Sequence, residues 1–396
     1  MKTNAERIKS VRPGAALLIM ALLLPAPVWA AVLWSEIAGR LAPDDCLRVA
    51  PQTTLIIDGD AVLERLEVRG SVEFQDAGPR SLEASEVRVT GAFRVGAADA
   101  PFSNDLEIRL VGAAGCAAEF ALLERYLIQP LSNELERIVM LLPLAAGSFA
   151  PLAADDQRTI LVLDDGQLEM YGSDPGLPWT TLASTATGTQ MTVSASTGWT
   201  DADQVVLAPT DFVHDEADEA VLLGAPTPTA DGETWNLAWP LAFEHYANAA
   251  DVVPVFGEVG KLNRNVRVYS PTPAVLPYDR EDCSAGGFSG AHLEFDGAEI
   301  RIERPNGGSA NAILEFIEVY NAGKFDRLGH YPIHFHMLDN AAGARVHGVS
   351  VHHSANRGIV VHGSRDVVLS DNLVHDVVGH GFYLEEAPAM ATIRNR

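Results

Sequence analysis

Histidine is concentrated in one part of this chain, and it is the side chain best suited to move protons or bind metal ions near neutral pH. Nine of the twelve histidines lie between His330 and His380, in a stretch that opens with Gly329-His330-Tyr331-Pro332-Ile333-His334-Phe335-His336. Two acidic residues, Glu385 and Glu386, follow closely. We therefore take residues 329–386 as the candidate location of any chemistry and ask which elements would position them.

The histidine-rich stretch contains a repeated pattern of alternating apolar residues. Ile333-His334-Phe335-His336 aligns with Ile359-Val360-Val361-His362 and with Phe382-Tyr383-Leu384-Glu385, at offsets of 26 and 23 residues. Periods of roughly 20 to 30 residues with strand-like alternation are typical of a parallel β-helix. Successive side chains of a strand point to opposite sides. The first and third positions of each segment are therefore predicted to point inward.

The two remaining positions of each segment form outward columns, His334–Val360–Tyr383 and His336–His362–Glu385. Adjacent coils lie about 4.8 Å apart, so the second column brings two imidazoles and a carboxylate toward a common point. Such a set suits zinc, calcium or another divalent metal, and it also suits acid–base catalysis. Polar side chains can equally stack for structure alone, and that interpretation stays open.

Other polar residues near the column are candidates for binding a substrate. A second ladder is predicted to stack Tyr320, His352 and His375. Arg357 can hold a carboxylate through paired hydrogen bonds. The full set of predicted substrate-binding residues is Tyr331, His334, His352, Arg357, His375 and Tyr383.

The N-terminus has the composition of an export signal. Four basic residues within 1–12 precede an apolar run, 15–24, that ends in prolines and the small-residue sequence Val28-Trp29-Ala30. This pattern predicts a secretory signal peptide over 1–30. The run of about ten apolar residues is shorter than the roughly 20 that a bilayer requires. We expect an exported protein in the periplasm, on the cell surface or outside the cell, with no membrane span once the signal is removed.

The chain is strongly acidic, with a formal net charge of −25. Signal removal takes away four basic residues and one acidic residue, which leaves −28. A field of that sign disfavours nucleic acid as a partner. Residues 297–396 differ, with nine Lys/Arg against eleven Asp/Glu. The histidine-rich part is thus nearly neutral and can accept an anionic ligand. The sequence indicates no oligomeric state.

Three cysteines, Cys46, Cys116 and Cys283, are spaced unlike metal-binding pairs. Export permits one disulfide, and we prefer Cys46–Cys116 because both residues fall in the same predicted domain. Buried free thiols are the alternative.

The rest of the chain is predicted to be mostly β-structure. Short alternating runs separated by glycine turns indicate a β-domain over 31–172. Within it, residues of about 113–144 have helical spacing and are interpreted as a helical insertion. A second β-region is expected over 173–270, and a Pro/Gly-rich linker or loop over 271–289. The β-helix then occupies 290–396. Because Ala391-Thr392-Ile393-Arg394 resembles the start of another strand, we expect that further coils are missing at the C-terminus.

Several segments resemble a known family. Pro101-Phe102 followed by Leu106-Glu107-Ile108-Arg109-Leu110-Val111-Gly112 is similar to the centre of the eight-glycine (G-eight) domain. Tyr331-Pro332-Ile333-His334-Phe335-His336, with Asn356-Arg357 and Val361-His362-Gly363, resembles the cell-migration-inducing and cell-surface hyaluronidases and the fibrocystin-like proteins. The resemblance implies an all-β fold, a G-eight domain followed by a right-handed parallel β-helix.

The resemblance also implies a polysaccharide or other glycan as the partner. A hyaluronidase-like depolymerising enzyme would use Glu385, His336 and His362 as catalytic residues. Hydrolysis ordinarily needs two carboxyl groups about 5 to 9.5 Å apart, and Asp376 and Asp339 are the candidate partners of Glu385. The alternative is a non-catalytic adhesion module that binds glycans or protein. The sequence does not decide between hydrolysis, elimination and binding alone.

Overall fold

A computed structural model describes residues 31–128, 135–152, 156–213, 215–271, 296–386 and 392–394. The predicted signal peptide lies outside these residues, as do residues 272–289 of the predicted linker. Among the residues described, the helical content is one turn of α-helix, α1 (Trp34–Ile37), and one 3-10 turn, η2 (Ala38–Arg40). Within the described ranges, no helix is long and apolar enough to cross a membrane.

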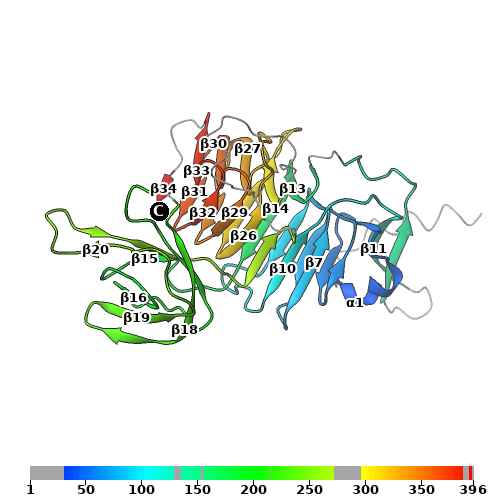
Figure 1. Ribbon diagram of the computed structural model, residues 1–396. Helices are drawn as coiled ribbons and strands as arrows, with labels where there is room; N and C mark the ends of the chain where they lie inside the picture. Colours follow the sequence, from blue (N-terminus) through cyan, green and yellow to red (C-terminus); the bar gives the residue numbers. More distant parts are fainter. Residues whose placement is uncertain are drawn as a thin grey trace, which may run out of the picture.

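Most strands belong to a three-sided solenoid in which the chain visits three parallel sheets in turn (Figure 1). The nine-stranded sheet holds, in spatial order, β1 (Val32–Leu33), β3 (Thr54–Ile57), β6 (Ser71–Phe74), β9 (Ala92–Val95), β14 (Gln167–Tyr171), β25 (Asn311–Glu315), β28 (Arg345–His347), β31 (Val368–Ser370) and β34 (Thr392–Arg394). The seven-stranded sheet holds β4 (Ala61–Val62), β7 (Arg80–Ala84), β10 (Leu106–Leu110), β23 (Val266–Tyr269), β26 (Ile317–Ala322), β29 (Ser350–Ser354) and β32 (Leu373–Val377). The ten-stranded sheet holds β12 (Leu135–Pro143), β11 (Glu119–Ile128), β2 (Cys46–Val49), β5 (Arg65–Val68), β8 (Glu86–Val89), β13 (Thr159–Leu163), β24 (Glu299–Glu303), β27 (Ile333–Asn340), β30 (Ile359–Arg365) and β33 (Phe382–Glu385).

The solenoid encloses one continuous hydrophobic core. Each strand sends every second side chain inward, where aliphatic residues of successive coils stack. In the ten-stranded sheet, for example, Ile302, Phe335 and Val361 occupy one inward column and are fully buried. Leu384 continues this column on the last described strand of the sheet and is 44% exposed. The alternation read from the sequence therefore determines which side chains face out.

A separate antiparallel sheet interrupts the solenoid between β14 and β23. Its six strands are β15 (Trp179–Thr181), β22 (Glu258–Lys261), β17 (Gln204–Leu207), β18 (Asp218–Thr229), β19 (Gly232–Leu237) and β16 (Gln190–Val193), beside the small pair β20 (Ala247–Asn248) and β21 (Val255–Phe256). It has its own core around Trp199 and Trp235. Figure 1 shows this green part lying beside the orange and red C-terminal coils.

The predicted domain boundaries differ from the structure in one respect. The strands assigned to the G-eight domain and to the β-helix form one solenoid, because β14 pairs with β25 and β13 pairs with β24. Strand β23, which the prediction placed in the second β-region, joins β10 to β26 in the seven-stranded sheet. Its buried Val266 and Val268 continue the inward columns of the solenoid.

The predicted helical insertion at about 113–144 is wrong. Residues Glu119–Ile128 and Leu135–Pro143 are the antiparallel strands β11 and β12, which extend the ten-stranded sheet beyond β2. Leucine, glutamate and arginine favour helices in isolation, but here the hydrogen-bonding edge of β2 provides backbone partners. Leu122 is buried, and Phe120 and Leu141 pack against the solenoid core. Tertiary pairing has overridden the local helical preference.

Cys46 and Cys116 form a disulfide, with their Cα atoms 5.4 Å apart. The bond joins the start of β2 to the segment that leads into β11, and so it fastens the hairpin to the first coils. Cys283 lies outside the described residues.

Candidate functional site

The predicted register of the histidine-rich coils is confirmed. His336 of β27 pairs with His362 of β30, and His362 pairs with Glu385 of β33. The imidazole rings of His336 and His362 are 5.1 Å apart between centroids. The outward face of these strands is called the histidine face below. It comprises the side chains on β24, β27, β30 and β33 that point away from the core, together with Arg357 just before β30.

The histidine face has a further member that the sequence reading missed. Glu303 of β24 pairs with His336, so the outward column is Glu303–His336–His362–Glu385. The Glu303 carboxylate lies 3.2 Å from His336 Nδ1. This contact holds the proton on Nδ1 and leaves Nε2 as a lone-pair acceptor in the neutral imidazole. The signal was present, because Ile300-Arg301-Ile302-Glu303 has the same alternation 33 residues earlier.

Arg357 organises the far end of the histidine face. Its guanidinium donates a hydrogen bond of 3.0 Å to the Tyr331 hydroxyl and lies 3.9 Å above the centre of the Tyr383 ring. The Glu385 carboxylate is 3.8 Å from the same guanidinium, which is longer than a hydrogen bond. Tyr331 is 2% exposed, so it supports Arg357 and is not accessible as the substrate-binding residue that the sequence predicted. Arg357 and Tyr383 remain accessible in part.

His334 points out of the solenoid but is only 2% exposed. Its Nδ1 donates to the Gly329 carbonyl at 2.8 Å, and its Nε2 is buried without a hydrogen-bond partner. Burial lowers the pKa of His334 to about 3. This imidazole therefore stays neutral near pH 7, and it does not reach the open face where the sequence reading placed it as a substrate-binding residue.

The burial of His334 predicts a pH-dependent stability. Because the folded pKa is depressed, His334 favours folding fully above its unfolded value of about 6.5, and that contribution is lost as the pH falls toward 3. Between pH 7 and pH 5 the loss is about 2 kcal/mol. The glutamine in His334→Gln cannot titrate. Between pH 7 and pH 5 the free energy of unfolding, measured with urea, should therefore fall by about 2 kcal/mol less in this variant than in the unsubstituted protein. The exposed His380→Gln serves as control and should behave like the unsubstituted protein. If the free energy of unfolding of His334→Gln falls as steeply with pH as that of the unsubstituted protein, His334 is not the source of the pH dependence.

A buried ionic cluster lies beside the histidine face. Glu299 contacts Lys324 Nζ at 3.0 Å and His330 Nδ1 at 3.0 Å, and it is fully buried. Burial opposes the charge of Glu299, but the His330 hydrogen bond and the nearby Lys324 and Arg301 charges hold its pKa at about 2. Arg301 bridges to the face, because it lies 3.3 Å from Glu299 and 3.7 Å from Glu303. The cluster thereby fixes the carboxylate that orients His336.

Three of the predicted site residues lie on a different face. His352 and His375 stack in register with Tyr320, as predicted, but on the seven-stranded sheet. His352 Nε2 lies 3.0 Å from the buried Glu318, and His375 Nε2 lies 3.0 Å from Glu219 of β18. Asp376 follows His375 on β32. His375 connects the solenoid to the antiparallel sheet through Glu219, whereas Glu318 lies on the neighbouring solenoid strand β26. The two histidines, predicted as substrate ligands, and Asp376, predicted as a catalytic partner of Glu385, therefore lie outside the histidine face.

The predicted metal set does not converge in this arrangement. Glu385 turns toward Arg357, and His362 Nε2 lies 3.5 Å from the carboxylate of Glu386. Among the residues that the structure describes, no group of three or more His, Cys, Asp or Glu side chains is placed to hold a metal ion. A metal on His336, His362 and Glu385 would require Glu385 to leave Arg357, and it stays an untested prediction.

Two known families match parts of this solenoid. Residues 34–125 match the G8 domain, and residues 297–394 match the CEMIP beta-helix. The resemblance read from the sequence is thus confirmed, and the histidine face from β24 to β33 lies within the β-helix match.

Similar proteins cover the chain to different extents. Fibrocystin-L of Mus musculus is 26% identical over 94% of this chain and 9% of its own length. Cell surface hyaluronidase CEMIP2 of Homo sapiens is 30% identical over 48% of this chain and 13% of its own length. The cell migration-inducing and hyaluronan-binding protein of Mus musculus is 30% identical over 48% and 14%. The chain therefore spans between 9% and 14% of the length of these relatives.

Proposed function

We propose that this chain is an exported, glycan-active protein that depolymerises an acidic polysaccharide on its histidine face. The observation that carries the proposal is the Glu303–His336 contact, a carboxylate-oriented imidazole on an open sheet face. Relatives named as hyaluronidases and as a hyaluronan-binding protein support a glycan as the partner. The names of the cell-surface relatives also support export.

The residues of the histidine face have complementary roles in this proposal. His336 accepts a proton at Nε2, because Glu303 holds the Nδ1 proton and stabilises the imidazolium that forms. His362, 5.1 Å away between ring centroids, is the second proton-transfer group. Arg357 binds a uronate carboxylate in place of the loosely held Glu385. Tyr383 lies beneath the guanidinium and limits its movement.

The spacing of carboxylates favours imidazoles as the proton-transfer groups. Glu303 and Glu385 lie on strands that are three intervals apart in the sheet, or about 14 Å between backbones. Glycosidases that use two carboxyl groups hold them about 5 to 9.5 Å apart. We therefore assign the proton transfers to His336 and His362. Product analysis then separates hydrolysis, which adds water to the broken bond, from elimination, which leaves a C4=C5 double bond.

A non-catalytic glycan- or protein-binding module is the second candidate function. This function is favoured by the ion pair between Glu385 and Arg357, because a paired Glu385 carboxylate is directed away from the imidazoles. It is also compatible with fibrocystin-L, which matches almost the whole chain and whose name states no activity. Under this function the face binds a polymer without shortening it.

The two functions are separated by incubating the purified mature chain with a panel of uronate-containing and neutral polysaccharides, with and without a chelator. We expect at least one uronate-containing polymer to be shortened. Size-exclusion chromatography measures chain length, and ultraviolet absorbance detects an unsaturated uronate. Elemental analysis of the same sample tests the metal prediction. If every polymer stays intact while one of them binds, the module function is correct and depolymerisation is not.

A further inference from the structure

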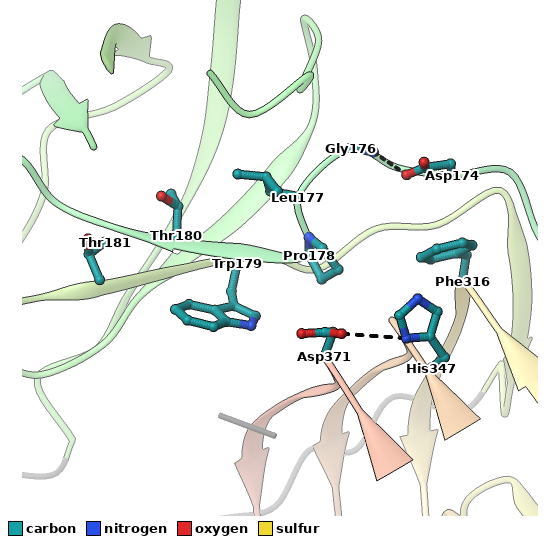
Figure 2. Close-up of a pocket in the computed structure, with 10 residues that line it drawn as sticks. All are labelled: Asp174, Gly176, Leu177, Pro178, Trp179, Thr180, Thr181, Phe316, His347 and Asp371. Carbon is teal, nitrogen blue, oxygen red and sulfur yellow. Dashed lines mark hydrogen bonds and ion pairs between the residues drawn. The ribbon is translucent and has the colours of Figure 1, made fainter. Parts of the chain in front are cut away.

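A second cleft lies away from the histidine face, between the antiparallel sheet and the solenoid (Figure 2). Its volume is about 660 Å³. That size falls in the usual range for small-molecule sites, about 300 to 1,000 Å³. The residues that give it chemical character are Asp174, Pro178, Trp179, Phe316, His347 and Asp371. They come from four separate segments of the sequence, so the cleft exists only in the folded chain.

The two walls of the cleft are fixed to each other. Arg264, which follows the last strand of the antiparallel sheet, is buried and donates from Nε to the Gly348 carbonyl of the solenoid at 3.1 Å. Gly260 of β22 approaches Leu373 so closely that an added Cβ would lie 2.6 Å from that side chain. The Glu219–His375 contact is a third connection. The cleft is therefore pre-formed.

Aromatic side chains lie on both walls of the cleft, Trp179 on the antiparallel sheet and Phe316 on the solenoid. Figure 2 shows the rings of Trp179 and Phe316 on opposite sides of the space, with Pro178 between them. Phe316 has a left-handed backbone, with φ of 52°, which is an uncommon conformation for a bulky residue. Its ring lies on Gly348, where an added Cβ would be 2.4 Å from the ring. The same left-handed corner recurs in the next two coils at Gly348 and Asp371, so the turn of the solenoid places the Phe316 ring at this edge of the cleft.

The solenoid wall also carries an acid–imidazole pair, His347 and Asp371. His347 Nδ1 is 2.8 Å from the Ser370 hydroxyl and 3.6 Å from the Asp371 carboxylate. In Figure 2 the second ring nitrogen of His347 faces the space below Pro178 and Phe316. Asp371 is half-exposed, and its carboxylate retains capacity for donors from a ligand. Asp174, whose carboxylate is tied to the Gly176 amide at 3.0 Å, adds a second negative charge.

We propose that this cleft binds a neutral pyranose unit of a glycan. The apolar face of a sugar ring packs on Trp179, since aromatic side chains bury large areas in a fixed geometry. Sugar hydroxyls donate to the Asp371 carboxylate, and such charge-assisted hydrogen bonds are stronger than neutral ones. His347 supplies the remaining polar contact through its second ring nitrogen.

The charges of the cleft determine the class of sugar. Asp174 and Asp371 place two carboxylates beside one imidazole, and a uronate or a sulfated sugar would be repelled there. The cleft thus selects neutral hexoses and N-acetylhexosamines, whereas Arg357 on the histidine face selects acidic sugars. The inference does not depend on catalysis at the histidine face, because it uses other residues on other elements.

The proposal is tested with the full mature chain by isothermal titration calorimetry against a β-1,4-linked N-acetylglucosamine tetrasaccharide and a cellotetraose, with a uronate-containing tetrasaccharide in parallel. We expect at least one neutral tetrasaccharide to bind. Trp179→Ala should weaken its affinity at least about 10-fold, since buried aromatic anchors dominate binding energies. Asp371→Asn, at a half-exposed position where folding is not at risk, should weaken it several-fold.

Two controls make the outcome specific. Phe212→Ala removes an aromatic side chain that is completely exposed and should leave the affinity unchanged. His336→Ala should also leave it unchanged, because His336 lies on the histidine face. The proposal is overturned if neither neutral tetrasaccharide binds, or if one binds equally to the unsubstituted, Trp179→Ala and Asp371→Asn proteins. If the unsubstituted protein binds a neutral tetrasaccharide but cleaves no polysaccharide, the histidine-face function alone is contradicted.

Discussion

The His336→Ala variant is expected to cleave polysaccharide about 10²- to 10⁴-fold more slowly than the unsubstituted chain, the range typical for a general acid or base. His336 is the imidazole oriented by Glu303, and its side chain is partly exposed on the histidine face. No other imidazole on the face has this arrangement, since His334 is buried and His362 faces Glu386 at 3.5 Å. Affinity for the polymer should change little, because Arg357 and Tyr383 are untouched.

Glu303→Gln separates an orienting role from a merely structural one. The amide still accepts a hydrogen bond but carries no charge, so it stabilises the imidazolium less. We expect the rate of polysaccharide cleavage to fall about 10-fold or more, and the acid limb of the pH–rate profile to shift to lower pH. His375→Ala is the matched control, because this histidine lies on the seven-stranded sheet. Equal rates for His336→Ala and His375→Ala, or an unmoved acid limb in Glu303→Gln, would reject the assigned roles.

The register of the candidate site was predictable because the alternation of each strand leaves few choices for which side chains face the core. An inward column must be apolar, and a shift of one residue would place His334 and His336 in the core. The alignment of Ile333 with Ile359 and Phe382 therefore fixed the pairing of His336 with His362 and Glu385, as the structure has it. The same reasoning, applied one coil earlier, would have found Glu303.

Exposure was not predictable in the same way. Strand alternation says which side of the sheet a side chain takes, and not what covers it there. His334 points away from the core and yet is 2% exposed, and the neighbouring Tyr331, just before β27, is equally buried. The direction of the Glu385 side chain could not be predicted from the sequence either, because this side chain can turn toward the imidazoles or toward Arg357. These outcomes depend on contacts between segments that no local pattern encodes.

The hairpin β11–β12 shows where periodicity itself was misleading. Apolar residues are so dense in Phe120-Ala121-Leu122-Leu123 that both a helix and a strand fit them. Only the free edge of β2 decides between the two, and the parallel pairing of Leu122 with Val49 is a contact over more than seventy residues. Long-range backbone pairing, and not propensity, selects the strand here.

Lys324→Met is expected to lower the free energy of unfolding by about 3 to 5 kcal/mol, the usual effect of removing one partner of a buried ion pair. Lys324 and Glu299 are both fully buried, with Nζ and the carboxylate 3.0 Å apart. Methionine retains most of the apolar stem but leaves the carboxylate without its ammonium. Urea denaturation at pH 7 measures the change. Arg94→Met removes a partner from an exposed ion pair and should cost less than about 1 kcal/mol.

The double variant Lys324→Met/Glu299→Gln tests whether the unpaired charge causes the loss. Removing both charges leaves no isolated carboxylate, so the double variant should be more stable than Lys324→Met alone.

The pH dependence of the stability difference between the unsubstituted protein and Lys324→Met gives a second check. Glu299 has its pKa depressed to about 2, so its carboxylate favours folding fully above the unfolded value of about 4.3 and loses this effect as the pH falls toward 2. The difference between the unsubstituted protein and Lys324→Met should therefore narrow over this interval, because a protonated Glu299 no longer needs the ammonium. A constant difference, or a double variant less stable than the single one, would show that packing of the lysine stem, and not its charge, holds this part of the solenoid together.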